Sequence, residues 1–393
     1  MQVKTIDEVF STQEYRERIA AVKRAGQRAA MDALIVTDPK NIFYLTGYDA
    51  YSFYVPQALI VAVDQPDEPV LILREQDVPA ATALTWLAPA NVVGYDEAYI
   101  HGTQHPMRVV AETISTLHWR PKNVGIDESD LSVGALHALH DTMPDATLMN
   151  ATGLVEWIRC HKSAREIDLI REAASFSDQA MLAAIDIIEP GVREADVAAD
   201  IYHELISGKG SAYGSTPWQP YLSCGVHTNN PHMSWSGRFI APDSPITIEL
   251  GGHRHNYAAG LARTVYLGSP PPEYRRLERT VAEGYDIARS TMAPGNTAEQ
   301  VHAAWSSVLG KQGFTKNARI GYSIGISFPK TAWIENTVSL AAGDRTELRP
   351  NMVLHLMLAV WLNDIGYSLS ETFVVGETGS ESLSSLPHEL IVK

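Results

Sequence analysis

A glutamate and two histidines alternate along one short segment of the chain, residues 246–268, "ITIELGGHRHNYAAGLARTVYLG". Even spacings separate Glu249, His253 and His255, so the three share one face if this segment is a β-strand. A carboxylate and two imidazoles on one face could hold a single metal ion. Histidines at a strand end more often face solvent or cap a turn, and these residues alone leave both interpretations open.

The charge balance narrows the class of partner. The 393 residues include 31 Lys and Arg against 46 Asp and Glu, a formal net charge of -15. Such a charge argues against general affinity for nucleic acid or for anionic membrane surfaces. A cationic or zwitterionic small molecule suits it better, although a surplus of surface acid also serves solubility alone.

The cysteine content and the N-terminus favour a cytoplasmic protein. Cys160 and Cys224 are the two cysteines, and the polar N-terminus has no apolar core of a signal peptide. The longest apolar runs, at 58–63 and 352–362, are shorter than the ~20 residues that span a bilayer. We therefore expect these runs to be buried strands and expect no membrane partner.

The first part of the chain predicts a layered α/β domain. Helical periodicity covers residues 15–31, and the runs at 32–38, 57–64 and 69–75 are typical of strands buried on both faces. A helical stretch at 155–188, with a break near Lys162, could lead from one domain to the next. At 393 residues the chain is long enough for two cores.

The second part predicts an antiparallel sheet with helices. Helices are expected at 165–188, 193–207, 273–292 and 298–312. Between and after them, segments such as "ITIELGG", "GYSIGISF" and "YSLSETFVVGE" alternate as strands do. We place the two domains at residues 1–160 and 161–393.

Six short motifs occur in one order along the chain: "KSAREIDLIREA", "IEPGVREADVAADI", "SCGVHTNNPH", "LARTVYLG", "LRPNMVL" and "SETFVVGETGSESLSSLP". They resemble the pita-bread, or peptidase M24-like, family of creatinase, aminopeptidase P, prolidase and methionine aminopeptidase. The segment "DALIVTDPKNIFYLTGYDAYSFYVPQALIV" resembles the N-terminal domain of creatinase and prolidase. This resemblance implies the fold class, an N-terminal creatinase-type α/β domain followed by a C-terminal pita-bread domain, an α+β fold of antiparallel sheet and helices.

The resemblance breaks at the metal ligands. Metallopeptidases of this family hold two metal ions with two Asp, one His and two Glu, because hard divalent ions need that density of ligands. The corresponding positions here are Glu249, Gly260, Tyr322, Met357 and Glu371. A glycine and a thioether offer such ions nothing, so we predict no metal and no other cofactor.

The resemblance also assigns the candidate catalytic residues. His232, in "SCGVHTNNPH", matches the catalytic histidine of creatinase, the family member that works without metal. We expect His232, Glu249 and Glu371 to be catalytic. A metal-free pocket with two carboxylates and a histidine favours an amidinium or guanidinium, whose carbon is electron-poor without a Lewis acid and whose N–H groups pair with carboxylates.

Further residues are candidates for binding the substrate. Creatinase grips the substrate carboxylate with a Phe and an Arg two residues later; Phe53 matches the first and Val55 the second, so that clamp is incomplete here. In the creatinase dimer, the corresponding loop lines the site of the neighbouring subunit. This resemblance implies that the aromatic residues of the first domain line the site of a second copy, and it predicts a homodimer. Ordinary domain or dimer packing is the alternative. Tyr322 and Trp361 would fill the volume of the absent metals. The substrate-binding candidates are Tyr51, Phe53, Tyr54, Tyr322 and Trp361.

Within the family, the chain resembles the ectoine hydrolase branch, on "GYDAYSFYVPQ", "STPWQPYLSCGVHTNNPHMSW" and "IELGGHRHNYAAGLARTVYLG". That resemblance implies a small zwitterionic substrate, the cyclic amidine ectoine, opened to N-acetyl-2,4-diaminobutyrate. A creatinase-like amidinohydrolase, a Xaa-Pro metallopeptidase with unusual ligands and a non-catalytic binding module are the alternatives. The retention of both His232 and Glu249 favours an enzyme over a binding module.

Overall fold

The structure is a computed structural model that describes residues 9–117, 119–328 and 332–393. The chain divides into two compact units, Met1–Arg159 and Cys160–Lys393. Within the described ranges, no helix combines the length and the apolar character needed to cross a membrane.

The N-terminal unit is a mixed sheet with helices. Its strands are β1 (Ala33–Val36), β2 (Ala58–Ala62), β3 (Val70–Arg74), β4 (Val92–Tyr95), β5 (Asn123–Ile126) and β6 (Thr147–Asn150), in the order β4-β3-β2-β1-β5-β6. Its helices are α1 (Thr12–Arg28), α2 (Pro39–Thr46), α3 (Val78–Leu84), α4 (Ala98–His101), α5 (Met107–Thr116), α6 (Val133–Thr142) and α7 (Leu154–Arg159). β1, β2 and β3 are buried along their whole length, as their continuous apolar runs predict.

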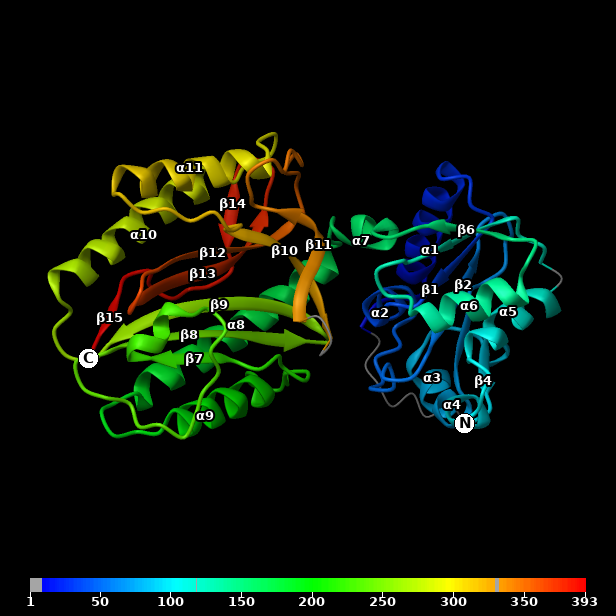
Figure 1. The fold of residues 1–393 in the computed structure, drawn as a ribbon, viewed down its shortest axis with the longest axis horizontal. Coiled ribbons are helices and arrows are strands. Elements are labelled where there is room, and N and C mark those ends of the chain that lie inside the picture. Colours follow the sequence, from blue (N-terminus) through cyan, green and yellow to red (C-terminus); the bar gives the residue numbers. More distant parts are fainter. Residues whose placement is uncertain (1–8, 118, 329–331) are drawn as a thin grey trace. The chain divides into compact units, whose positions relative to one another are not determined.

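The C-terminal unit is one large sheet with helices (Figure 1). Its strands are β7 (Tyr221–Cys224), β8 (Pro245–Arg254), β9 (Tyr257–Tyr266), β10 (Gly321–Phe328), β11 (Ala332–Ser339), β12 (Val353–Trp361), β13 (Gly366–Val375), β14 (Ser380–Ser382) and β15 (Ile391–Val392). The main order is β11-β10-β12-β13-β9-β8-β7, with antiparallel neighbours throughout this path. Its helices are α8 (Ala164–Ile187), α9 (Glu194–Ser207), α10 (Pro272–Thr291) and α11 (Ala298–Lys311). This architecture confirms the predicted fold class.

Local sequence signals explain where the elements begin and turn. Ser163 accepts a hydrogen bond from the Glu166 N–H, and the Glu166 carboxylate accepts one from the Ser163 N–H, a capping box that starts α8 at the predicted break. β8 and β9 are joined by His255 and Asn256, whose φ angles of 45° and 63° are those of a tight hairpin turn. This hairpin places two ten-residue strands of the sheet side by side.

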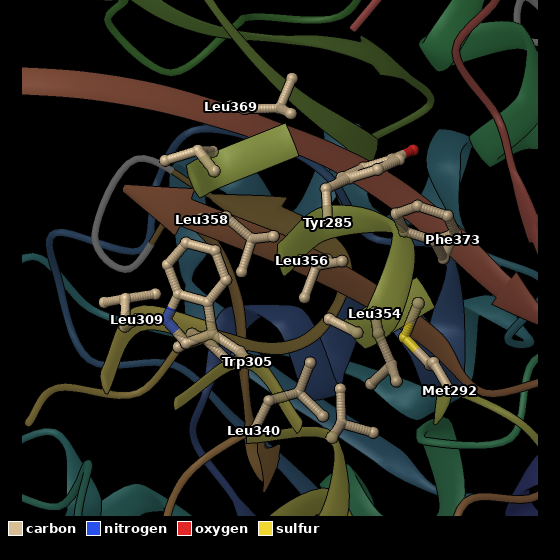
Figure 2. Close-up of a cluster of buried hydrophobic side chains, with 14 of the residues drawn as sticks. Tyr285, Met292, Trp305, Leu309, Leu340, Leu354, Leu356, Leu358, Leu369 and Phe373 are labelled. Carbon is tan, nitrogen blue, oxygen red and sulfur yellow. The ribbon is translucent and has the colours of Figure 1, made fainter. Parts of the chain in front are cut away.

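The helices cover one face of the sheet with apolar side chains. Alternate residues of β8, such as Ile246, Ile248 and Leu250, belong to the same buried cluster as residues of α8 and α9. A second cluster packs α10 and α11 against the sheet around Trp305 (Figure 2). The sheet contributes the leucines of β12 together with Leu369 and Phe373 of β13. Because strand side chains alternate between faces, the residues between these apolar positions must point to the other face.

Candidate active site

The face of the sheet opposite the helices carries small and polar side chains, and we call it the site face. Its residues on neighbouring strands are Tyr221, Thr247, Glu249, Gly260, Ala262, His355, Met357, Ser368 and Ser370. The pairing register fixes this set, since directly opposed residues of antiparallel strands share a face. Glu249 is opposed by Tyr221 on one side and Ala262 on the other.

A small hollow on the site face is built around Glu249. Its lining includes Tyr221, Glu249, Met357, Trp361 and Ser368. The structure therefore brings together two residues predicted from the sequence, Glu249 and Trp361. Met357, at one of the family's ligand positions, lines the same hollow and gives it an apolar wall.

The Glu249 carboxylate is partly shielded from solvent and accepts no hydrogen bond from the described residues. Glu249 is half-buried, and among the described residues none donates a hydrogen bond to its carboxylate. Burial raises the pKa of this carboxyl group to about 7, although the positive charge of Lys316 acts in the opposite direction. A carboxyl group that titrates near neutral pH is suited to acid–base chemistry.

This raised pKa predicts a stability gain on neutralising the residue. In the folded protein the pKa of Glu249 is about 7, above the ordinary 4.5. Ionising Glu249 therefore costs more free energy in the folded than in the unfolded protein. The free energy of unfolding is highest below pH 4.5 and falls as the pH rises through 7. We expect Glu249→Gln to raise the free energy of unfolding above that of wild type, and this increase should be ~2 kcal/mol larger at pH 8 than at pH 5.5.

Urea unfolding at the two pH values measures this difference. The matched control is Glu283→Gln, at an exposed position of α10, whose effect should change by less than about 0.5 kcal/mol. An equal effect of Glu249→Gln at both pH values would contradict the raised pKa.

His232 lies beside the hollow, on an exposed turn. Its ring centroid is 5.6 Å from that of Tyr221, the residue paired with Glu249, and the preceding Pro231 lines the hollow. The His232 N–H donates to the Asn230 side chain at 2.9 Å, which holds the turn. His232 and Glu249 are thus neighbours of one aromatic residue, and His232 is open to solvent.

Glu371 does not join this site. It opposes Leu356 on β12 and lies on the helix-covered face, whereas its neighbour Ser370 opposes Met357 on the site face. Its fully buried carboxylate is an ion-pair partner of Arg263 and accepts hydrogen bonds from Tyr285 and Ser382. This placement contradicts the catalytic role predicted for Glu371, which instead locks β13 to β9 and α10.

A buried histidine occupies the space next to Gly260. A Cβ atom on Gly260 would lie 2.9 Å from His355 Cε1 and 3.1 Å from His355 Nε2. The imidazole is held between the Ser370 hydroxyl, at 2.8 Å from Nε2, and the Tyr322 hydroxyl, at 3.4 Å from Nδ1. Burial lowers the pKa of His355 to about 3, so the ring is neutral.

The family's metal pair does not fit these residues. Of the family's five ligand positions, three hold Gly260, Tyr322 and Met357, and at the fifth it is Ser370, rather than its neighbour Glu371, that points to the site face. His355 fills the room that an acid at position 260 would need. In the described part of the chain, no group of three or more His, Cys, Asp or Glu side chains could hold a metal ion. The residues present therefore offer a dinuclear centre one carboxylate, that of Glu249.

The close approach of Gly260 and His355 predicts a steric penalty. Gly260→Ala should lower the free energy of unfolding by ~1–3 kcal/mol, because a fully buried, hydrogen-bonded ring must shift. Gly237→Ala is the control, since a Cβ there meets nothing within 4 Å. Urea midpoints compare the variants, and a Gly260→Ala protein as stable as Gly237→Ala would rule out the contact.

The two histidines after Glu249 do not assemble a second site with it. His253 is four residues further along β8, about 13 Å away. Its Nδ1 contacts the Gly251 carbonyl at 2.9 Å, and burial lowers the pKa of His253 to about 4. His255 occupies the hairpin turn rather than the strand, as the turn-capping interpretation expects.

The other substrate-binding candidates fall into two groups. Tyr322 is buried on β10, where its hydroxyl accepts from Trp333 Nε1 at 3.4 Å and the charge of Glu249 helps raise its pKa. Tyr51 and Tyr54 are 63% and 66% exposed in the N-terminal unit, and the Phe53 ring lies 4.9 Å from that of Tyr51. The role of these three residues in the site stays a prediction.

Sequence reasoning missed three residues of this region: Tyr221, which is paired with Glu249, Lys316, which lies beside Trp361, and His355, which lies beside Gly260. Tyr221 and His355 could be found only from the strand register, because they lie 28 residues before and 106 residues after Glu249. Lys316 lies between α11 and β10, where no periodicity exists to place it. Its Nζ lies 4.5 Å from the Trp361 ring centroid, and burial lowers its pKa to about 8.

Both units of the chain, the α/β unit and the helix-covered antiparallel sheet, match known protein families. Residues 168–377 match the model of metallopeptidase family M24, and residues 18–161 match the creatinase/prolidase N-terminal domain. The chain belongs to metallopeptidase family M24 and is a hydrolase.

Three relatives illustrate the range within the family. The chain is 39% identical to the uncharacterized hydrolase/peptidase y4tM of Sinorhizobium fredii and 33% identical to the ectoine hydrolase of Halomonas elongata, each over 98% of both chains. The crystal structure of dipeptidase PepE from Mycobacterium ulcerans superposes with a TM-score of 0.83, at 24% identity over 98% of this chain and 99% of the other. That structural likeness shows the fold alone.

Proposed function

We propose that the protein is a metal-independent hydrolase that opens the cyclic amidine ring of ectoine to N-acetyl-2,4-diaminobutyrate. One observation carries the proposal: the Glu249 carboxylate lies in a hollow where the family places metal ligands, and it accepts no hydrogen bond from the residues that the structure describes. The likeness to an ectoine hydrolase over 98% of both chains supports the choice of substrate.

The chemistry of an amidinium suits this hollow. Its carbon is electron-poor without a Lewis acid, and its N–H groups donate to a carboxylate. A cation beside Glu249 would favour the ionised carboxylate and lower its pKa from about 7. Binding would therefore generate the reactive form of Glu249.

Two mechanisms fit Glu249, and we favour the nucleophile. A carboxylate oxygen bonds to the amidine carbon, and the C=N electron pair moves to a ring nitrogen. The lone pair of the other ring nitrogen re-forms a C=N bond as the ring C–N bond breaks and His232 delivers a proton to the departing nitrogen. Water then adds to the same carbon and returns a proton to His232, and the bond from that carbon to the Glu249 oxygen breaks, which leaves the N-acetyl group and the free carboxylate. In the alternative, Glu249 takes a proton from water, whose oxygen bonds to the amidine carbon.

The proposal disfavours the other candidate functions and extends to the location and assembly of the protein. Val55 at the arginine position of the creatine clamp disfavours creatine. The donor set disfavours a dinuclear peptidase, and the retention of both His232 and Glu249 disfavours a binding module. We propose a cytoplasmic homodimer, in which the exposed Tyr51 and Tyr54 contribute to the site of the second copy.

A side-by-side assay tests the substrate. The protein is incubated with ectoine, creatine and a Xaa-Pro dipeptide, and the products are read by mass spectrometry. We expect an 18 Da gain on ectoine, the mass of one water, with ring opening, and no turnover of the other two. Hydrolysis of the dipeptide without turnover of ectoine would overturn the proposal.

A further inference from the structure

Lys316 is a cation beside the hollow that the proposed chemistry does not use. Its Nζ lies 4.5 Å from the ring centroid of Trp361 and 3.5 Å from the Met357 carbonyl oxygen. Both of these residues line the hollow around Glu249. The half-buried ammonium group therefore sits at the wall of the site.

None of the described carboxylates contacts this ammonium group. Within the described ranges, no Asp or Glu oxygen lies within the 4.0 Å of an ion pair with Lys316 Nζ, although the charge of Glu249 raises the lysine's pKa against the larger effect of burial. Lys316 and Glu249 thus interact across a gap without contact. A zwitterion fits such a gap, with its cation toward the acid and its anion toward the base.

The substrate proposed above is such a zwitterion and needs an anchor for its carboxylate. The position of the creatine-clamp arginine holds Val55, which offers no positive charge. A second cation, Arg319, lies on the same loop with its guanidinium carbon 4.5 Å from the Tyr322 ring centroid. The loop between α11 and β10 therefore adds positive potential at this side of the hollow.

We propose that Lys316 binds the carboxylate of the substrate while the amidinium faces Glu249. This inference rests on the proposed function. The hollow has a volume of about 10 Å³, enough for about one water molecule, so a six-membered ring requires wall side chains to move. Lys316 would leave the Trp361 ring for the carboxylate, which widens the hollow and forms a charge-assisted hydrogen bond.

The test compares ectoine with the same cyclic amidine lacking the carboxylate, 2-methyl-1,4,5,6-tetrahydropyrimidine. Losing a hydrogen bond to a charged group should lower kcat/KM of Lys316→Gln for ectoine about 10- to 100-fold. For the analogue that lacks the carboxylate, kcat/KM of the variant should stay within about threefold of wild type. Lys316→Arg should recover part of the ectoine activity, and Lys311→Gln, an exposed lysine at the end of α11, is the charge-matched control.

The outcomes separate the two proposals. Equal losses on both substrates, or no loss on ectoine, would overturn the role of Lys316 while ectoine turnover by wild type upholds the function. Calorimetric titration of ectoine into wild type and Lys316→Gln covers the case of no turnover. If wild type binds ectoine and Lys316→Gln binds it more weakly, the result supports Lys316 as the carboxylate-binding residue. Equal affinities, or no binding by wild type, would overturn this role.

Discussion

Replacing Glu249 with alanine or glutamine should reduce ectoine turnover by at least ~10⁴-fold, the upper end of what positioned proton transfer contributes. Both proposed mechanisms pass through its carboxylate, as nucleophile or as base. Among the described residues, Glu249 is the one acid in the hollow's lining, and Glu371, the other acid predicted from the sequence, lies on the opposite face of the sheet. Steady-state product formation measures the loss.

Matched variants give that prediction its controls. Glu283→Gln makes the same change at an exposed position on α10 and should keep wild-type turnover. Intact-mass analysis of acid-quenched wild type should detect an adduct of substrate mass if Glu249 is the nucleophile. Near wild-type turnover by Glu249→Gln would refute both mechanisms.

His232→Ala should lower kcat by ~10²- to 10⁴-fold, the usual contribution of a positioned proton donor. The departing ring nitrogen needs a proton, and the His232 ring stands beside Tyr221 at the edge of the hollow. Because His232 is exposed, its loss should leave the fold intact. Rapid-quench or steady-state assays measure kcat, and thermal unfolding checks the fold.

His203→Ala, at an exposed position of α9, is the control for histidine loss and should have no effect on kcat. A His232→Ala enzyme within fivefold of wild type would remove His232 from the proton path. Water or Tyr221 would then have to supply the proton.

The fold could be predicted because hydrophobic periodicity and helix signals coincide with the elements. The helices expected at 165–188 and 298–312 correspond to α8 and α11 within about a residue, and the break before α8 is a capping box. Strand alternation in "ITIELGG" correctly put Glu249 opposite in face to Ile248 and Leu250. Each of these signals is local, so the sequence alone carries it.

The candidate site could be predicted in part. A one-residue difference on a strand moves a side chain to the other face, and this is why Glu371 is excluded and Ser370 faces the site. The available signal was that Glu371 shares a strand face with Leu369 and Phe373, two apolar residues that pack under the helices. The contact between Gly260 and His355 joins positions 95 residues apart and has no local signal.

The most direct test of the account is ectoine turnover by protein stripped of metal. The enzyme is treated exhaustively with chelator, its metal content is measured by mass spectrometry of the elements, and turnover is assayed with and without added divalent ions. We expect undiminished turnover with far less than one metal ion per chain, because among the described residues the site face offers a metal pair one carboxylate, that of Glu249. Turnover that disappears with the metal and returns in proportion to the metal restored would contradict the account.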